Sequence, residues 1–373
     1  MNRTAPLLLL LGLTAPVYAA PQVSIAQLAD YLAEARGARE SDEAVADRLS
    51  QVTLSEQLTE RTLDRLLAGT ATGPKTLEQL QILAAASIFR EPPVTELPKD
   101  PVPDPTAQQQ LISSASKYVN GVLHLLPDFL ATRTTLGFDN TTGAPDRKHS
   151  KPKARLHFVR EYRREISYLN GREVYDQTAG SSGTTRGRTN PPYGLASWGE
   201  FGPILTLVLS DSLKGSVVWS RWQTDNNDRQ MAVFHYAVPR PDSHYLIDFC
   251  CYSPEPDDPP VTPFRERPAY HGDIYVDPAT GTITRFTLEA ELSEDDPITA
   301  AGIAVDYSRV DIGGRDYVCP VRSVAISEIH NFVMESVDKV GPERDINLVR
   351  FIDYHKFASN ARVVAPVSDE PAH

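Results

Sequence analysis

The sequence has few cysteines and lacks the short motifs that mark the common catalytic sites. Only three cysteines occur in 373 residues, and three thiols at this spacing are too few to hold a structural zinc ion. No G-x-S-x-G, H-E-x-x-H, phosphate-binding loop or dinucleotide-binding fingerprint is present. The nine histidines are scattered without the spacing of metal ligands. We therefore predict no metal site, no cofactor and no catalytic residues, and we favour a protein without enzymatic activity.

The small number of cysteines also limits the disulfides. In an oxidising compartment, three cysteines are expected to form one disulfide and leave one thiol. A bond from Cys250 or Cys251 to Cys319 would join two strands that are distant in the sequence, and we take Cys251–Cys319 as the pair. A bridge between the adjacent Cys250 and Cys251 remains an alternative, although its geometry is strained.

Beyond residue 19 the sequence has no apolar run long enough to span a bilayer. Residues 1–19 have the three parts of a secretory signal peptide: Arg3 at the start, an apolar run at 6–13 and a small-residue cleavage site at 17–19. We therefore expect an exported, soluble protein, periplasmic or extracellular, without a transmembrane segment in the mature chain.

The formal net charge of −12 argues against binding of nucleic acid. Positive charge is nevertheless concentrated between Arg147 and Arg188, where eleven Lys and Arg residues outnumber four Asp and Glu residues. Such a stretch can contact anionic headgroups or envelope polymers. The alternative is that these side chains only protect the edges of strands from pairing with other chains.

The first part of the chain has the apolar period of helices. Residues 20–91 are predicted to form a helical bundle, with capping-box residues at Ser24, Thr53 and Thr76 as the starts of three helices. A short helix is expected around Val45. This bundle shows no residues that suggest chemistry.

A proline-rich segment separates the bundle from the rest of the chain. Residues 92–105, PPVTELPKDPVPDP, are expected to be a stiff linker. A domain at 106–362 follows, and it opens with a helix that starts near Thr106. The last residues, 363–373, are expected to be a flexible tail.

From Arg155 onward the apolar period is two, as in strands. Asn170-Gly171 marks a hairpin, because both positions tolerate a positive φ. About ten strands with tight turns indicate one large antiparallel sheet, and a sheet of that size should curve.

The segment Ser197–Gln223 interrupts the strand pattern with a short apolar helix. Ser197 and Glu200 have capping-box spacing, so the helix could begin there. Alternatively it begins at Gly202, with Pro203 in the first helical position. In both versions the helix covers the concave face of the sheet, which would otherwise be bare. The predicted fold class is α+β: an N-terminal helical bundle followed by a large curved, half-barrel-like antiparallel sheet with a helix packed on its concave face.

Four stretches of the sequence resemble a known group of proteins: YVNGVLHLLPDFLATRTT, SWGEFGPILTLVL, AYHGDIYVDPATGTITRFTLEAE and VDYSRVDIGGRDYVCPVR. They are similar to a group of uncharacterised exported bacterial proteins. The order of elements resembles in turn the half-barrel superfamily of lipoprotein carriers and of a periplasmic stress sensor. The resemblance covers about residues 118–357 and implies a curved sheet that binds acyl chains or protein segments on its concave face. It implies no catalytic residues.

We predict a ligand-binding groove between the mid-chain helix and the sheet. The alternative is that the same aromatic residues only close the core. The predicted function is an exported soluble protein that binds a lipid or acyl chain, or a segment of an envelope protein. Alternatives are a secreted hydrolase with a site built from strand residues, and a structural envelope protein that docks through its bundle. The predicted lining residues are Phe158, Arg160, Tyr162, Arg164, Ile166, Phe201, Leu205, Trp219 and Trp222.

Overall fold

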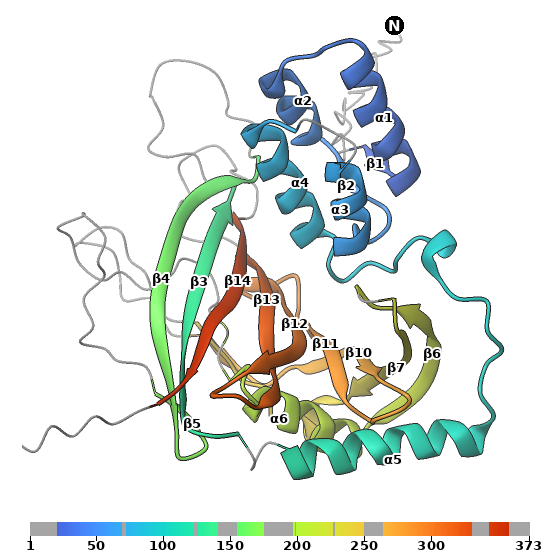
Figure 1. Ribbon diagram of the computed structural model, residues 1–373, viewed down its shortest axis with the longest axis vertical. Coiled ribbons are helices and arrows are strands. Elements are labelled where there is room, and N and C mark those ends of the chain that lie inside the picture. Colours follow the sequence, from blue (N-terminus) through green and yellow to red (C-terminus); the bar gives the residue numbers. More distant parts are fainter. Residues whose placement is uncertain are drawn as a thin grey trace, which may run out of the picture.

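The chain folds into an N-terminal helical bundle and one large curved antiparallel sheet (Figure 1). This arrangement confirms the predicted α+β class. The signal peptide expected at 1–19 and the tail expected at 363–373 lie outside the described residues. The computed structural model describes residues 21–68, 72–122, 126–140, 155–174, 197, 199–226, 228–249, 264–329 and 343–357.

The elements of the described part of the chain are as follows. The helices are α1 (Ile25–Gly37), α2 (Asp42–Leu49), α3 (Glu60–Ala68), α4 (Pro74–Ala86), α5 (Pro105–Val122) and α6 (Pro203–Ser212). The strands of the large sheet are, in spatial order, β5 (Arg172–Val174), β4 (His157–Leu169), β3 (Phe129–Asp139), β14 (Glu343–Lys356), β13 (Asp316–Ile329), β12 (Ile298–Asp311), β11 (Ile283–Glu291), β10 (Ala269–Val276), β7 (Gln230–Val238) and β6 (Ser216–Thr224). Two short pairs join β1 (Gln22–Val23) to β2 (Thr53–Leu54) and β8 (Ile247–Phe249) to β9 (Phe264–Glu266). None of the described helices is both long and apolar enough to cross a membrane.

The strand order places α6 in the connection between the two edges of the sheet. The first long strand, β3, pairs with the last strand, β14, so the two ends of the domain meet inside the sheet. The outermost strands are β5 and β6, which are consecutive in the chain. The segment that links them therefore has to pass from one edge of the sheet to the other, and this segment contains α6.

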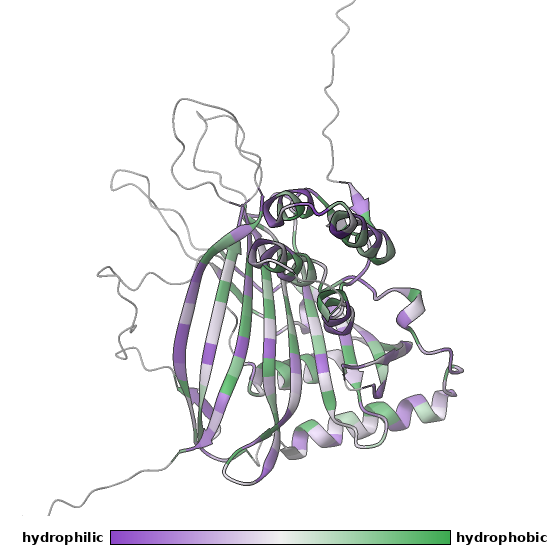
Figure 2. Cartoon of the chain, turned by 45° about the horizontal axis from the view of Figure 1, so that its top comes forward, coloured by the Kyte–Doolittle hydropathy of each residue, from purple (hydrophilic) through white to green (hydrophobic). Residues whose placement is uncertain are grey.

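Both faces of the sheet are covered, as the alternating side chains of β12 show. Ile303 and Val305 belong to a core cluster with α5 and α6, which cover what we call the hollow face. Ala304, which lies between them, belongs to a second cluster with α4, on what we call the bundle face. Successive side chains of a strand point to opposite faces, so the two helical layers lie on opposite sides. Figure 2 shows the resulting alternation of polar and apolar bands along the strands.

The bundle packs directly on the sheet. Ile82, Ala85 and Ile88 share one buried cluster with side chains of β3, β12, β13 and β14. The guanidinium group of Arg285 on β11 donates a hydrogen bond to the carbonyl oxygen of Ile88 at 3.1 Å. The bundle and the sheet therefore have a common core. The division into residues 20–91, 92–105 and 106–362 stays a prediction, although one turn of 3₁₀ helix, Val94–Glu96, lies within the predicted linker.

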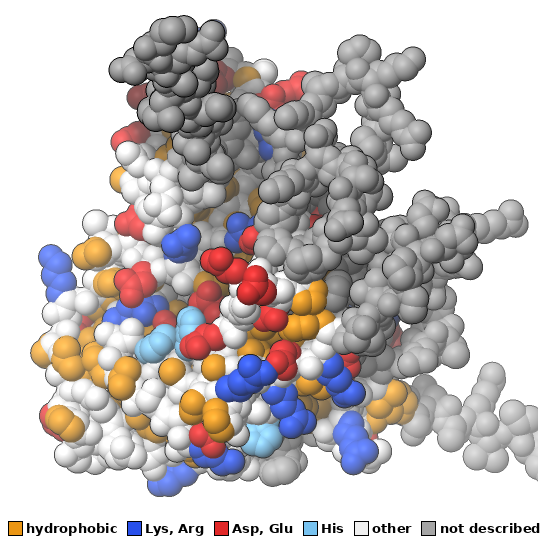
Figure 3. All heavy atoms as spheres, turned by 180° about the vertical axis from the view of Figure 1, so that it is seen from behind, with side chains coloured by type: hydrophobic (Ala, Val, Ile, Leu, Met, Phe, Trp, Pro, Cys, Tyr) orange, Lys and Arg blue, Asp and Glu red, His pale blue; other side chains and the backbone are white. Residues whose placement is uncertain are grey.

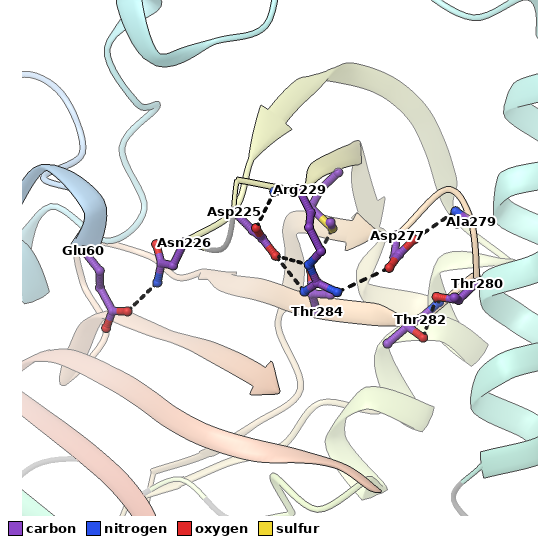
Figure 4. Close-up of polar contacts among 10 residues, drawn as sticks. Glu60, Asp225, Asn226, Arg229, Asp277, Ala279, Thr280, Thr282 and Thr284 are labelled. Carbon is purple, nitrogen blue, oxygen red and sulfur yellow. Dashed lines mark hydrogen bonds and ion pairs between the residues drawn. The ribbon is translucent and has the colours of Figure 1, made fainter. Parts of the chain in front are cut away.

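The α3 helix also holds the turn between β6 and β7. Asn226 donates a hydrogen bond to Glu60, and Arg61 forms an ion pair with Asp228 at 2.8 Å. Figure 4 shows Asn226 reaching Glu60 from this turn. The edge of the sheet formed by β6 and β7 is thus fastened to the bundle.

Within the same turn, Arg229 lies between two carboxylates. Its guanidinium group is 2.7 Å from Asp225 and 3.5 Å from Asp277, which follows β10 (Figure 4). These two ion pairs tie the β6–β7 turn to the β10–β11 turn.

The helix starts were predicted correctly only in part. Ser24 and Gln27 form the complete capping box at the start of α1. The start predicted at Thr53 is wrong, because Thr53 pairs with Gln22 in a short parallel strand and α3 begins at Glu60. The start predicted at Thr76 is also wrong, because α4 begins at Pro74 with Gly73 as its N-cap.

In place of the Thr76 hydroxyl, a side chain from another helix caps α4. The carboxylate of Asp42 accepts hydrogen bonds from the backbone N–H groups of Lys75 and Thr76 at 3.0 and 2.9 Å. Pro74 occupies the first turn of the helix, where the missing N–H of proline costs nothing.

The mid-chain helix begins in the second of the two predicted ways. Gly202 is the N-cap with φ 144°, and Pro203 is the first helical residue. That φ lies in the region that favours glycine. The capping box at Ser197 and Glu200 is therefore wrong, and those two side chains hydrogen-bond to each other instead. The hairpin turn at Asn170-Gly171 is confirmed, with φ values of 51° and 76°.

Cys319 is a free and fully buried thiol on β13. The expected disulfide from Cys319 to Cys251, or to Cys250, is therefore not formed here; both of those residues lie outside the described part of the chain. Cys319 lies in an apolar cluster with Phe129 and Phe201, where a thiol packs as a small apolar group. Burial raises its pKa to about 12.

The shared core predicts how a substitution in the bundle acts on the whole chain. Ile88→Ala should lower the free energy of unfolding by about 2–5 kcal/mol, because the deleted side chain leaves a cavity between α4 and the sheet. Val94→Ala is the control, since Val94 is 80% exposed and its truncation should change stability by less than about 0.5 kcal/mol. Urea titrations would measure both. Equal effects of the two substitutions would contradict a core shared by bundle and sheet.

Candidate functional site

The hollow face is the candidate ligand-binding face, and it is filled by α5 and α6 in this structure. Leu205 and Val208 of α6 and Ala115 and Val119 of α5 are buried against β7, β10, β11 and β12. Figure 1 shows the two helices at the same end of the sheet, away from the bundle. This packing confirms that the mid-chain helix lies on the concave face, and it adds α5 as a second cover.

Two small cavities remain between these helices and the sheet. Each has a volume of about 20 Å³, which is enough for one water molecule but not for an acyl chain. Tyr118 and Val119 of α5 line the first cavity, and Ile112, Ala115 and Ser116 of α5 line the second. α5 therefore forms a wall of both cavities.

The start of α6 is anchored by an aromatic cluster. The ring of Phe201 is fully buried, and its centroid lies 5.3 Å from those of Phe129 and Phe351. The ring of Tyr168 is 6.1 Å away. Aromatic pairs at these separations add to the energy of simple burial, so this end of α6 is held firmly on the sheet.

A buried polar network lies beside the aromatic cluster. Glu200 is fully buried, and one of its carboxylate oxygens accepts a hydrogen bond from Ser197 Oγ at 2.7 Å and another from Ser323 Oγ at 3.3 Å. The guanidinium group of Arg133 on β3 is 3.4 Å from the same oxygen. The hydroxyl of Tyr307 donates to the carbonyl of Glu200 at 2.9 Å. This network fixes the backbone that leads into α6.

Five of the predicted lining residues lie on the hollow face of β4 or at the start of α6. Ile166 and Phe201 belong to the same buried cluster. Arg160, Tyr162 and Arg164 alternate with Ile166 along β4 and oppose Gly137, Thr135 and Arg133 of β3. Arg160 lies across Gly137, where a Cβ atom would meet the Arg160 side chain at 3.0 Å. Leu205 lies further along α6, in the neighbouring cluster.

Phe158 does not lie with the others. The register between β3 and β4 shifts between Gly137 and Phe138, and this bulge turns Phe158 to the bundle face. There its ring packs against Phe138 with the centroids 6.0 Å apart. The prediction placed Phe158 on one face with Tyr162 and Ile166, because it assumed unbroken alternation.

The two predicted tryptophans mark the far edge of the hollow face. The rings of Trp219 and Trp222 on β6 lie 4.8 Å apart, and Trp219 also contacts Phe234 at 5.4 Å. The indole N–H of Trp222 donates to the carbonyl oxygen of Pro101 at 2.9 Å. Pro101 lies in the segment that leads into α5, so β6 holds the approach to that helix.

The described residues offer no catalytic constellation. Two histidines pair with aspartates: His235 Nδ1 is 3.0 Å from Asp273, and His244 Nδ1 is 2.7 Å from Asp211. In the described part of the chain, neither imidazole hydrogen-bonds to a serine, threonine or cysteine side chain that could act as a nucleophile. Across the same residues, no group of three or more His, Cys, Asp or Glu side chains is arranged to hold a metal ion.

The basic stretch is largely engaged within the protein where it is described. Arg155 pairs with Asp47 of α2 at 3.6 Å, and Arg163 pairs with Asp353 of β14 at 3.2 Å. Most of Arg147–Arg188 lies outside the described residues, so binding of this stretch to anionic polymers stays a prediction. Figure 3 shows acidic and basic side chains mixed over the described surface of one side of the molecule.

The sequence pattern did not indicate a row of buried polar residues on β14. Asp345 and Asn347 alternate with Ile346 and Leu348, which belong to the core of the bundle face, so the polar side chains point to the hollow face. Both are buried. Alternating polar and apolar residues usually indicate a strand with one solvated face, and for that reason the pattern did not suggest a site.

Comparisons with known proteins add one distant likeness. No protein-family model and no curated protein matches the chain. Among solved structures, it is similar to a LolA superfamily protein from Nitrosomonas europaea. The likeness covers 67% of this chain and 93% of that chain, with 10% sequence identity and a TM-score of 0.27. These values are too low to establish a shared fold or a shared ligand.

The Glu200 network predicts a strongly destabilising substitution. Glu200→Ala should lower the free energy of unfolding by about 3–5 kcal/mol, because it leaves the guanidinium group of Arg133 buried without its carboxylate partner. The double variant Glu200→Ala/Arg133→Met should recover part of the loss. Asp248→Ala is the matched control, since Asp248 forms an exposed ion pair with Arg265 that should contribute less than about 1 kcal/mol. A double variant no more stable than Glu200→Ala would contradict this role.

Proposed function

We propose that this chain is an exported binding protein that holds an elongated apolar group between α5 and the hollow face of the sheet. The group is an acyl chain of a lipid, or an apolar segment of a partner protein. Export is proposed from the signal-like residues 1–19 and places the protein in the periplasm or outside the cell. The observation that carries the proposal is that α5 walls both of the small cavities described above.

The two helices on the hollow face are held to very different degrees. α6 is anchored by the Phe201 cluster and the Glu200 network. Of the described side chains of α5, only Ala115 and Val119 are fully buried. Leu111, Ile112 and Tyr118 are partly buried against the same core. α5 is therefore the cover that a ligand can displace.

The free energy gained by burying an acyl chain is large enough to displace α5 from the sheet. Burial of the small apolar stripe of α5 is worth on the order of 5 kcal/mol. An acyl chain gains about 0.8 kcal/mol for each buried methylene group, so roughly six carbons offset the loss of the α5 contacts. Beneath α5 the sheet presents Phe234, Ile274 and Phe286, which form an apolar floor for such a chain.

The segment before α5 provides a tether for this movement. Asp100 accepts a hydrogen bond from Gln230 at 2.8 Å, and the carbonyl of Pro101 accepts one from Trp222. Both contacts are hydrogen bonds to the segment before α5, and neither involves α5 itself. This segment therefore stays on β6 and β7 while α5 moves. In this proposal Trp222 acts on the ligand through the tether, and Leu205 contacts the ligand directly.

The first test is direct detection of the ligand. Protein purified from its own compartment and examined by native mass spectrometry should carry additional mass, and organic extraction should release it as lipid. A protein that carries no additional mass, and that does not bind an apolar fluorescent dye after delipidation, would contradict the proposal.

The role of α5 is tested by two adjacent substitutions that introduce the same side chain. Val119→Asp places a carboxylate in the contact between α5 and the sheet, so α5 should detach and the fluorescence of a bound apolar dye should rise several-fold. Asn120→Asp, at an exposed position, should leave the fluorescence unchanged. Circular dichroism would show that the sheet persists in both variants. Equal fluorescence of the two folded variants would exclude α5 as the cover of the apolar face.

A further inference from the structure

A buried polar surface continues the hollow face beyond the apolar part under α5. It consists of Asp139 on β3, Ser327 on β13, and Asp345 and Asn347 on β14, which we call the polar floor. Asp345 lies directly opposite Asp139 on one side and Ser327 on the other. All four residues are buried, although none of them is apolar.

Asp345 is the unusual member of the polar floor. The residue is 1% exposed, and neither of its carboxylate oxygens has a hydrogen-bond partner among the residues that the structure describes. A buried carboxylate without partners is costly, because it has lost its hydration and gained nothing in exchange. Glu200, on the same face, has two hydroxyl groups and a guanidinium group at one oxygen, and only its other oxygen lacks a hydrogen-bond partner among the described residues. Asp345 therefore differs from Glu200 in having both oxygens available to a hydrogen-bond donor from a ligand.

The charges around Asp345 favour a positive partner. Burial raises the pKa of Asp345 to about 7, together with the carboxyl groups of Glu343 and Asp139; Arg160 acts in the opposite direction. The imidazole of His157 lies 4.0 Å from Asp139. Arrival of a cation would allow Asp345 to ionise.

The polar floor borders the Phe201 cluster on the hollow face. Along β14, the side chains that follow Asn347 on this face are Val349 and Phe351, and both belong to the cluster around Phe201. Strand β14 thus presents a polar end and an apolar end on one surface. That pattern matches a ligand with a polar head and an apolar chain.

We propose that the polar floor binds the head of the ligand, and that this head is an ammonium group. This inference rests on the proposed function and names the class of ligand as cationic amphiphiles. An ammonium group carries three hydrogen-bond donors and no acceptor, so it can satisfy both oxygens of Asp345 at once. Its charge adds to the strength of those bonds.

The experiment compares three alkyl ligands of equal chain length by calorimetry: dodecylamine, dodecyltrimethylammonium and laurate. The wild-type chain should bind dodecylamine at least tenfold more tightly than the other two, since only dodecylamine is both a cation and a donor. Asp345→Asn should weaken dodecylamine binding about tenfold and leave laurate binding unchanged. Asp248→Asn, which alters an exposed carboxylate, is the control and should change neither.

Stability and pH dependence distinguish a ligand role from a structural one. Asp345→Asn should keep or raise the melting temperature, because it removes a buried charge without breaking a bond. Dodecylamine affinity should rise as the pH increases through about 7, where Asp345 loses its proton. A marked loss of stability in Asp345→Asn with unchanged dodecylamine affinity would overturn the inference in favour of a structural role.

The remaining outcomes separate the two proposals. Tight binding of all three ligands without preference would overturn the ammonium site and leave the apolar binding face standing. Failure of all three to bind, also in Val119→Asp, would overturn both the proposed function and the head-group site.

Discussion

One constraint organises the structure: both faces of a single open sheet are apolar and have to be covered. Antiparallel sheets commonly leave one face to solvent, but here neighbouring residues of β12, Ile303 and Ala304, lie in two different cores. The bundle covers one face, and α5 with α6 covers the other. The helical bundle, α5 and α6 are therefore required for the sheet to be stable, although in the sequence they look like separate units.

Topology and side-chain packing fix the two covers of the hollow face in different ways. α6 lies in the segment between β5 and β6, the outermost strands on opposite edges of the sheet. Both ends of this segment are therefore attached to the sheet. α5 enters from the bundle through an irregular segment, and hydrogen bonds to Trp222 and Gln230 hold that segment. An element with few buried contacts opens most easily, and α5 is such an element.

Two buried carboxylates on the hollow face, Glu200 and Asp345, differ in how many hydrogen bonds and ion pairs they make. Glu200 has hydrogen bonds from two hydroxyl groups and an ion pair with Arg133, and it positions the start of α6. Among the described residues, Asp345 lacks a hydrogen-bond partner at both oxygens, whereas Glu200 lacks one at its second oxygen only. Since an unpaired buried carboxylate is retained at a cost, the second pattern points to a ligand and the first to a structural role.

The sequence by itself determined the fold class, the antiparallel strands and the short helix at 203–212, because apolar periodicity, glycine turns and proline positions act locally. It did not determine which side chains share a face, since one bulge at Gly137 and Phe138 moved Phe158 away from Tyr162. Only the tertiary structure showed that Cys319 is a free core thiol and that the polar residues of β14 are buried. These features depend on what packs against each strand, and that contact comes from residues far away in the chain.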